Sequence, residues 1–192
     1  MDRAVNIGPA ARLPTWLRTC AVVALGIAAW SNTAHSPFLF DDSLALVKNH
    51  TIRSLSMRML FPPPETTVAG RPVVNISFAL NYALSGLDLP PLHATNLALH
   101  LFAGLLLMAL IRRTLLLPRL SGRYAGDADL LSTLCALSWV VHPLQTESVT
   151  YLVQRAESLA GLLLLATLYA SLRAFEAERP FAWSAAAVLA CW

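Results

Sequence analysis

Long apolar runs separated by short polar segments dominate the chain. The clearest run covers residues 92–111 and ends at Arg112 and Arg113, and a second covers residues 159–175. A helix needs about 20 mostly apolar residues, rising about 1.5 Å each, to cross about 30 Å of hydrocarbon. Both runs therefore predict membrane-spanning helices, and they place the chain in the all-α class as a polytopic membrane helix bundle.

Three further apolar runs predict weaker spans. Residues 16–34 hold only a short uninterrupted apolar core, and residues 126–142 are short unless the helix tilts or packs partly against protein. Residues 181–192 stop while still apolar, after about 18 Å of helix. We therefore expect one truncated transmembrane domain over residues 1–192, with four complete spans and a partial fifth.

The first run also has the features of a signal peptide, because Arg3, Arg12 and Arg18 form a basic start before it. An uncleaved span is favoured, since further spans follow and no good small-x-small cleavage site does. We expect this run to stay in the protein as its first span.

Lysine and arginine positions predict the orientation. Cytoplasmic loops retain an excess of both residues, and a cytoplasmic N-terminus places these of the 14 there: Arg3, Arg12, Arg18, Arg112, Arg113, Arg119, Arg123, Arg173 and Arg179. The remainder fall outside: Lys48, Arg53, Arg58, Arg71 and Arg155. We therefore expect residues 36–91 and 143–157 to lie on the extracytoplasmic side.

The loop over residues 36–91 is too long to be a plain linker. Residues 43–60 and 73–84 have helical texture, so we expect interfacial helices along the outer membrane surface. Asn49-His50-Thr51 and Asn75-Ile76-Ser77 fit the N-glycosylation pattern, which has meaning only in a eukaryotic secretory compartment.

Composition supports the membrane class. Apolar residues make up 56% and charged residues 13%, against a usual charged share of about 25%. This excludes a disordered chain, and a formal net charge of +3 without a basic patch excludes a nucleic-acid-binding module. Cys20, Cys135 and Cys191 lie far apart in apolar runs, so we expect small buried hydrophobes and not metal ligands.

Asp41 and Asp42 are the most informative polar pair, since they follow the first span where it leaves the membrane. Adjacent carboxylates repel each other and an apolar surface desolvates them. Both effects favour a bound proton and suit one of the two as a general base. The alternative is that one of them simply caps a helix beginning at Ser43. The pair also offers oxygen ligands for a divalent cation, although two carboxylates make an incomplete site.

Polar residues also recur on the second predicted span. His93, Asn96 and His100 share a helix face at i, i+3 and i+7. Polar faces avoid lipid, so we expect this face to point into the bundle. The two histidines lie about 10 Å apart along the helix axis, which favours interhelical hydrogen bonds over a shared metal ion.

The segment after the third span is rich in polar residues. Pro143 is expected to end that span, and a helix over residues 145–157 would place four polar residues on one face: Glu147, Tyr151, Gln154 and Arg155. Charges beside a span are paired, lie at the interface or line a cavity. A plain interfacial anchor with a pair between Arg155 and Glu147 is equally open.

Taken in order, these motifs resemble a known family, the transmembrane and tetratricopeptide-repeat O-mannosyltransferases and their bacterial relatives, which are membrane glycosyltransferases of the C-type fold. The resemblance covers residues 36–172. It rests on Phe40-Asp41-Asp42 with Asn49, Arg71-Pro72 with Ser77-Phe78 and Leu80-Asn81, Gly86-Leu87-Asp88, His93-Ala94-Thr95-Asn96 with His100, His142-Pro143-Leu144-Gln145-Thr146-Glu147-Ser148-Val149, and Gln154-Arg155-Ala156-Glu157-Ser158-Leu159. Each motif is weak by itself, whereas the ordered set is specific.

The resemblance implies transfer of a mannose-like sugar from a polyprenyl or dolichyl phosphate donor to a protein or glycan hydroxyl on the extracytoplasmic side. It implies a catalytic base at Asp41 or Asp42, and candidate substrate-binding positions at Arg71, His93, Asn96, Glu147, Arg155 and Glu157. An arginine fork at position 71 or 155 suits the departing phosphate. The setting would be a bacterial inner membrane, or the ER membrane of a eukaryote, in contact with membrane lipid.

The family's tetratricopeptide repeats and later spans do not occur in the sequence, so we expect this N-terminal fragment by itself to be inactive. Two other functions stay open. In a non-catalytic membrane anchor or scaffold, the same polar residues would only hold helices together. A transporter would show paired broken helices in two halves, and no such symmetry is visible.

Overall fold

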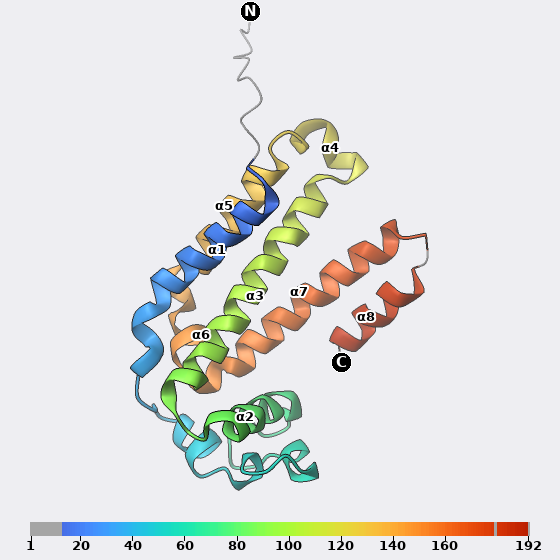
Figure 1. The fold of residues 1–192 in the computed structure, drawn as a ribbon. Coiled ribbons are helices and arrows are strands. Elements are labelled where there is room, and N and C mark those ends of the chain that lie inside the picture. The colour runs from blue at the N-terminus through green and yellow to red at the C-terminus, as the bar shows by residue number, and fades with distance from the viewer. Residues whose placement is uncertain (1–12, 179, 192) are drawn as a thin grey trace, which may run out of the picture.

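The computed structural model describes residues 13–178 and 180–191, and every regular element in these ranges is helical. Five apolar helices build the bundle: α1 (Thr15–Trp30), α3 (Leu89–Leu115), α5 (Ala128–Val140), α7 (Arg155–Glu176) and α8 (Phe181–Cys191). Figure 1 shows α1, α3 and α5 side by side, whereas α7 meets α3 at one end and leans away from it toward α8. The all-α helix bundle expected from the sequence is confirmed.

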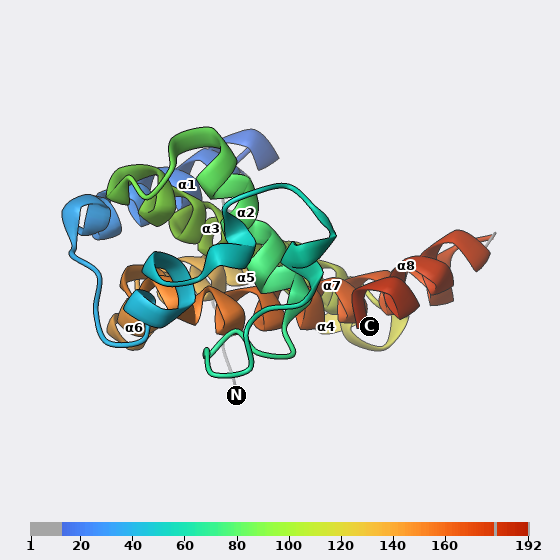
Figure 2. The ribbon, with the colours of Figure 1, turned by 90° about the horizontal axis from the view of Figure 1, so that it is seen from below.

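The shorter elements gather at the two ends of the bundle. At one end, which we call the turn end, α4 (Pro118–Tyr124) lies between α3 and α5. The opposite end, which we call the loop end, holds α2 (Pro72–Ser85), α6 (Thr146–Thr150) and single turns at Ser43–Val47, His50–Ile52, Met57–Leu60, Pro143–Gln145 and Leu152–Gln154. Figure 2, seen from below, shows these segments folded across the ends of the long helices. The loop end is therefore a packed layer.

In the described part of the chain, two helical stretches are long and apolar enough to cross a membrane, Leu89–Leu115 and Leu152–Glu176. They contain the spans expected at 92–111 and 159–175. The second stretch includes the turn that precedes α7. These two helices support the prediction that the protein lies in a membrane.

The other three expected spans are helical but short. α1, α5 and α8 have 16, 13 and 11 residues and reach about 24, 20 and 17 Å, against about 30 Å of hydrocarbon. A turn at Ser31–His35 extends α1. Full crossing at 16–34, 126–142 and 181–192 therefore stays a prediction, and Trp192 lies outside the described residues.

Charged side chains hold the turn end together. The carboxylate of Asp129 lies 3.0 Å from Arg18 and 2.6 Å from Arg112, and Arg113 pairs with Glu176 at the end of α7. The start of α1, the α3–α5 connection and the end of α7 thus share one end of the bundle, as alternating spans require (Figure 1). The side of the membrane that this end faces stays a prediction. Three arginines of the charge count lie outside the described residues: Arg3, Arg12 and Arg179.

The loop between α1 and α3 is only partly as expected. α2 confirms the helix expected over 73–84, but a continuous helix over 43–60 is wrong. The chain leaves the helical conformation at Asn49, whose φ is −79° and ψ 104°. Asn49 Nδ2 donates to the carbonyl of Ala45 at 3.0 Å, and its Oδ1 accepts from the backbone N–H of Thr51 at 3.0 Å. Such local bonds to the backbone compete with helix formation.

Two apolar clusters form the core. The loop-end cluster consists of Ala45, Leu46, Ile52, Val68, Val74, Phe78, Ala79, Leu92, Leu152, Val153 and Ala156. The mid-bundle cluster consists of Val22, Leu101, Met108, Ala136 and Val140. Burial stabilises a large apolar side chain by about 1.5–3 kcal/mol, so the first cluster fixes the loop on α3 and α7. Cys20, Cys135 and Cys191 are exposed, so their expected burial is wrong: α1, α5 and α8 turn them outward.

Two glycines allow the close approach of α1, α3 and α5. A Cβ added at Gly26 would lie 2.7 Å from Cγ1 of Val140 and would overlap Leu101. A Cβ added at Gly104 would overlap Cγ2 of Val140. Because a valine side chain in a helix is held in one favoured rotamer, Val140 has no easy way to move aside.

Substitution of Gly104 by alanine should therefore separate α3 from α5. We expect Gly104→Ala to lower the free energy of unfolding by about 1–3 kcal/mol, as overpacking does. The matched control is Gly161→Ala in α7, where no atom lies within 4 Å of the added Cβ; helix propensity predicts a gain of up to about 1 kcal/mol there. Equilibrium unfolding of both variants in detergent measures their free energies of unfolding. Equal values would contradict the close contact of Gly104 with Val140.

Candidate functional site

The acidic pair lies at the loop end, in a turn that follows the Ser31–His35 extension of α1. Phe40, just before it, has a φ of 37°, a conformation that is rare for a bulky side chain. Phe40 is 88% exposed, whereas Asp42 is 1% exposed. The turn thus separates two adjacent carboxylates into one that is half-buried, Asp41, and one that is fully buried.

The carboxylate of Asp42 joins two distant segments. Its Oδ2 accepts from the backbone N–H of Leu39 at 3.0 Å, and its Oδ1 accepts from the backbone N–H of Val153 at 2.8 Å. Its side chain makes no bond to the turn that begins at Ser43, so the helix-cap interpretation is wrong for Asp42. The residue instead ties the first loop to the segment that precedes α7.

Electrostatics at Asp42 are mixed. Burial raises its pKa above the ordinary 3.8, and the negative charge of Asp41 raises it further. The two backbone N–H groups and nearby His93 act in the opposite direction. His93 Nε2 donates to the carbonyl of Ser36 at 2.9 Å, while its Nδ1 has no partner among the described residues. Asp42 is therefore a buried acid that its hydrogen bonds only partly stabilise as an anion.

Asp41 lies in a different setting. Its backbone N–H donates to the Tyr151 hydroxyl at 3.1 Å, and within the described ranges its carboxylate has no hydrogen-bond partner. Burial, together with the charges of Asp41, Asp42 and Glu147, raises the pKa of Tyr151. The tyrosine therefore keeps its proton beside the acidic pair.

The segment after α5 is broken, and the expected single helix over 145–157 is wrong. Pro143 does end α5, but a turn, α6 and a second turn follow before α7 begins. Tyr151 interrupts the helix because its backbone is extended, with φ −85° and ψ 114°. Consequently Glu147 and Arg155 do not share a face, and the expected ion pair between them is absent from the described residues.

Arg155, one of the predicted substrate-binding residues, is wholly buried, with 0% of its surface exposed. Its Nε donates to Asn96 at 2.7 Å, Nη1 to Asn81 at 2.6 Å, and Nη2 to the carbonyl of Leu92 at 3.0 Å. The guanidinium also lies 4.3 Å from the centre of the Phe78 ring. No carboxylate forms an ion pair with it in the described part of the chain. The donors of Arg155 thus serve the protein itself and do not face a substrate.

The polar face of α3 points into the bundle, as expected. His93, Asn96 and His100 are each at most 2% exposed. His100 Nε2 and Trp30 Nε1 both donate to the carbonyl of Val140, at 2.9 and 2.8 Å. That carbonyl lies at the end of α5, where the N–H four residues on, that of Leu144, donates to His142 Nδ1 instead. The expected interhelical hydrogen bonding is confirmed, and it satisfies a backbone carbonyl at the end of α5.

The accessible charged residues lie on the rim of the loop end. Arg71 and Glu157 form a pair at 3.7 Å, and their side chains are 51% and 60% exposed. Glu147 is also exposed. Two arginines were predicted from the sequence to bind a phosphate, Arg71 and Arg155. Of these, Arg71 is the one that a phosphate can reach without a change in packing.

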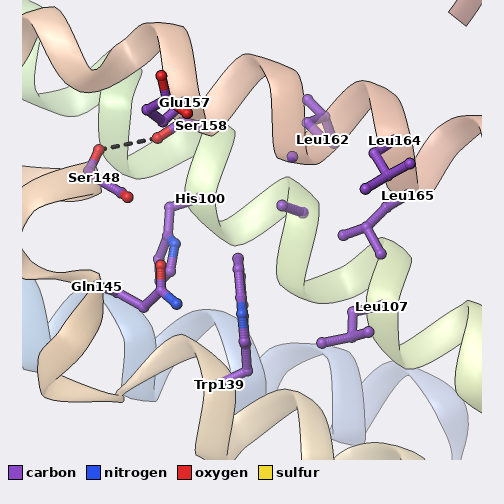
Figure 3. A pocket seen from close by; sticks show the side chains of 12 residues that line it. His100, Leu107, Trp139, Gln145, Ser148, Glu157, Ser158, Leu162, Leu164 and Leu165 are labelled. Carbon is purple, nitrogen blue, oxygen red and sulfur yellow. Dashed lines mark hydrogen bonds between the residues drawn. The ribbon is translucent and has the colours of Figure 1, made fainter. Parts of the chain in front are cut away.

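A cavity of about 320 Å³ opens where α7 leans away from α3 (Figure 3). Leu107, Leu162 and Leu165 line its apolar part, and Gln145, Ser148, Glu157 and Ser158 lie toward its polar end. The ring of His100 is stacked on that of Trp139, with 4.6 Å between the ring centres, and lies between the apolar and the polar part of the cavity. No sequence pattern indicated this cavity, because it arises from the angle between two helices.

Both N-glycosylation patterns are buried. Asn49 and Asn75 are each 0% exposed, and Asn49 Nδ2, the atom that a glycan would modify, donates to Asn75 Oδ1 at 2.8 Å. Asn75 Nδ2 in turn donates to Thr51 and to the carbonyl of Met59 at 2.9 and 2.8 Å. The two asparagines are therefore structural and not accessible for modification.

The arrangement offers little to a metal ion. The described residues contain no group of three or more His, Cys, Asp or Glu side chains that could hold one. Both oxygens of Asp42 already accept N–H groups, so the acidic pair does not present two free carboxylates.

Comparison with known proteins gives a consistent set of relatives. The chain is 28% identical to mouse (Mus musculus) protein O-mannosyl-transferase TMTC3 over 173 residues, which is 85% of the chain. It is 30% identical to mouse TMTC1 over 178 residues, or 82% of the chain, and 31% identical to Drosophila melanogaster Tmtc3 over 166 residues, or 77%. The chain is a homologue of the TMTC protein O-mannosyl-transferases. The resemblance drawn from its motifs is confirmed.

The shared region is a small part of each TMTC relative. The chain covers 18% of each of these three proteins and 25% of human (Homo sapiens) TMTC4. No model of a protein family matches the chain, and no solved structure matches it significantly. A bacterial source stays a prediction.

The buried sequons predict an unglycosylated wild type. In a eukaryotic secretory membrane we expect no glycan on the native protein, because modification of Asn49 would break its hydrogen bonds. Glu65→Asn, in an exposed part of the loop, creates a new pattern with Thr67 and should add one glycan if the loop end is lumenal. A mobility shift removed by endoglycosidase measures this, with Glu65→Asn/Thr67→Ala as control. A glycan on the wild type would contradict the burial of both asparagines.

Asp42 predicts a pH-dependent stability. A pKa raised in the folded state means that its favourable contribution is complete below about pH 4, the unfolded value, and declines as pH rises through the folded pKa. An asparagine side chain at this position cannot titrate, so Asp42→Asn should gain stability relative to wild type as pH rises from 4. Unfolding free energies between pH 4 and 8 measure the difference, and Asp88→Asn controls for the loss of one loop carboxylate. A difference that falls with pH would refute the assignment.

Proposed function

We propose that the full-length protein is a membrane O-mannosyltransferase and that Asp41 is its general base. The supporting observation is the hydrogen bond from Val153 N–H to Asp42, because it brings the acidic turn onto the segment before α7. The relatives are named protein O-mannosyl-transferases, and the proposed activity is theirs. Because the chain spans about a fifth of their length, the activity is proposed for the whole protein.

The two aspartates divide their tasks. A base must reach the acceptor hydroxyl, and Asp41 is half-buried with a carboxylate that has no partner among the described residues. Asp42 is 1% exposed and its oxygens already accept two N–H groups. We therefore assign proton transfer to Asp41 and positioning to Asp42 in this proposal.

The proposed reaction is a displacement at the anomeric carbon of the sugar. The acceptor hydroxyl oxygen bonds to that carbon while its proton passes to Asp41, and the bond to the lipid phosphate breaks. A positive charge stabilises the departing phosphate, and Arg71 is the accessible candidate at the loop end. The donor is proposed to be a polyprenyl or dolichyl phosphate sugar, and the loop end is proposed to face the extracytoplasmic side.

A non-catalytic scaffold is the alternative. Its support is the dense hydrogen bonding of the loop end, where buried Arg155 donates to the buried side chains of Asn81 and Asn96. A scaffold requires these contacts but does not require a free carboxylate at Asp41. Substitution of Asp41 therefore separates the two functions.

We expect Asp41→Ala in the full-length protein to lower sugar transfer by about 10²–10⁴-fold, the usual contribution of a general base, with unchanged membrane insertion. Alanine is used because asparagine at this position would create an N-glycosylation pattern with Ser43. Transfer of labelled mannose from dolichyl phosphate mannose to an acceptor protein, per amount of folded enzyme, is the measurement. Asp127→Ala at the turn end is the matched control and should keep full activity. Normal transfer by the Asp41 variant would favour the scaffold.

A further inference from the structure

Arg155 connects three segments that are far apart in sequence. It is the first residue of α7, and its acceptors lie on α2 (Ser77, at 3.4 Å, and Asn81) and on α3 (Leu92 and Asn96). The side chain is wholly buried, although a cation at a helix N-terminus is disfavoured by the helix dipole. An arginine in this position persists only because its acceptors compensate for its lost hydration.

Two short routes lead from Arg155 to the acidic pair. Along the backbone, Val153 is two residues away and donates its N–H to Asp42. Through the side chain of Asn96, the route runs from Arg155 Nε to Asn96 Oδ1, while Asn96 Nδ2 donates to the carbonyls of Tyr151 and Leu152, both at 3.4 Å.

The routes end on the groups that orient the aspartates. The Tyr151 hydroxyl accepts the backbone N–H of Asp41, and the N–H of Val153 holds the carboxylate of Asp42. Both lie between α6 and α7, where Tyr151 has an extended backbone and Val153 belongs to the single turn Leu152–Gln154. The loop-end cluster buries this turn, and Asn96 with Arg155 supplies its polar contacts.

We propose that Arg155 is a positioning residue of the acidic pair: through Asn96 and the 151–155 backbone, its guanidinium sets the place of Tyr151 and Val153, and thereby of Asp41 and Asp42. This changes the role that the sequence suggested, a phosphate contact. The consequence for sugar transfer rests on the proposed function, whereas the geometric consequence does not.

Arg155→Lys is the first test, because lysine keeps the charge and loses the planar fork that reaches several acceptors. Hydrogen exchange of the full-length protein should show faster exchange at the amides of Val153 and Leu39, which donate to Asp42. Transfer assays should show kcat lowered by about 10–100-fold, with KM for the lipid-linked donor within about twofold, since the side chain does not touch the donor.

Arg18→Lys is the matched control. Arg18 is also a buried arginine, 4% exposed, but it pairs with Asp129 at the turn end. It should lower stability without changing exchange at Val153 or kcat per folded enzyme. If Arg155→Lys folds poorly, Asn81→Ala keeps the arginine, removes one acceptor and should produce the same exchange signature with a smaller amplitude.

The outcomes separate the two proposals. Unchanged exchange at Val153 and Leu39 in both loop-end variants overturns the positioning role. Faster exchange with unchanged kcat, in a protein that Asp41→Ala inactivates, also overturns it, because Arg155 would then be merely structural. If the wild type transfers no sugar, or if Asp41→Ala transfers it normally, the proposed function fails, and the exchange data still decide whether Arg155 sets the acidic pair.

Discussion

The loop end depends on a cation buried without a carboxylate. Removing a charged group from water costs several kcal/mol even after the protein relaxes, and Arg155 has no ion pair to offset this among the described residues. Its hydrogen bonds to amide and carbonyl oxygens take that place, since a bond to a charged group contributes about 1.5–3 kcal/mol. The acceptors come from α2 and α3, so the charge is tolerated only when loop and spans are docked.

This dependence explains why the loop is compact although little of it is regular helix. Asn49 and Asn75 bond to each other and to backbone carbonyls, and Asn81 and Asn96 bond to Arg155. A buried polar group left without a partner costs about 1–3 kcal/mol. Each amide therefore fixes the segments that it joins, and the apolar loop-end cluster fills the space between them. The turn end is held differently, by partly exposed ion pairs, which contribute less.

What the sequence predicted followed from local and periodic features. Apolar runs located α3 and α7, and the spacing of His93, Asn96 and His100 identified the inward face of α3. The failures came from interactions between distant residues or from single backbone positions. The break at Asn49 depends on its own side-chain bonds, and the break at Tyr151 on an extended backbone stabilised by contacts with Asn96. The burial of Arg155 could not be predicted from local sequence patterns, because its acceptors lie 59 to 78 positions earlier in the chain.

The separation of roles within the acidic pair follows from the same physics. A carboxylate that is buried and accepts two backbone N–H groups is a good anchor but a poor base, because both of its oxygens are already engaged and an incoming hydroxyl has no route to them from solvent. Asp41, one residue earlier, is held in place by the same turn but is only half-buried. Phe40, with its positive φ, makes this possible: the turn sends Asp42 inward and leaves Asp41 at the surface. Adjacent acids of identical chemistry thus become different through one backbone conformation, and the bond from the Val153 N–H holds the inward carboxylate in place.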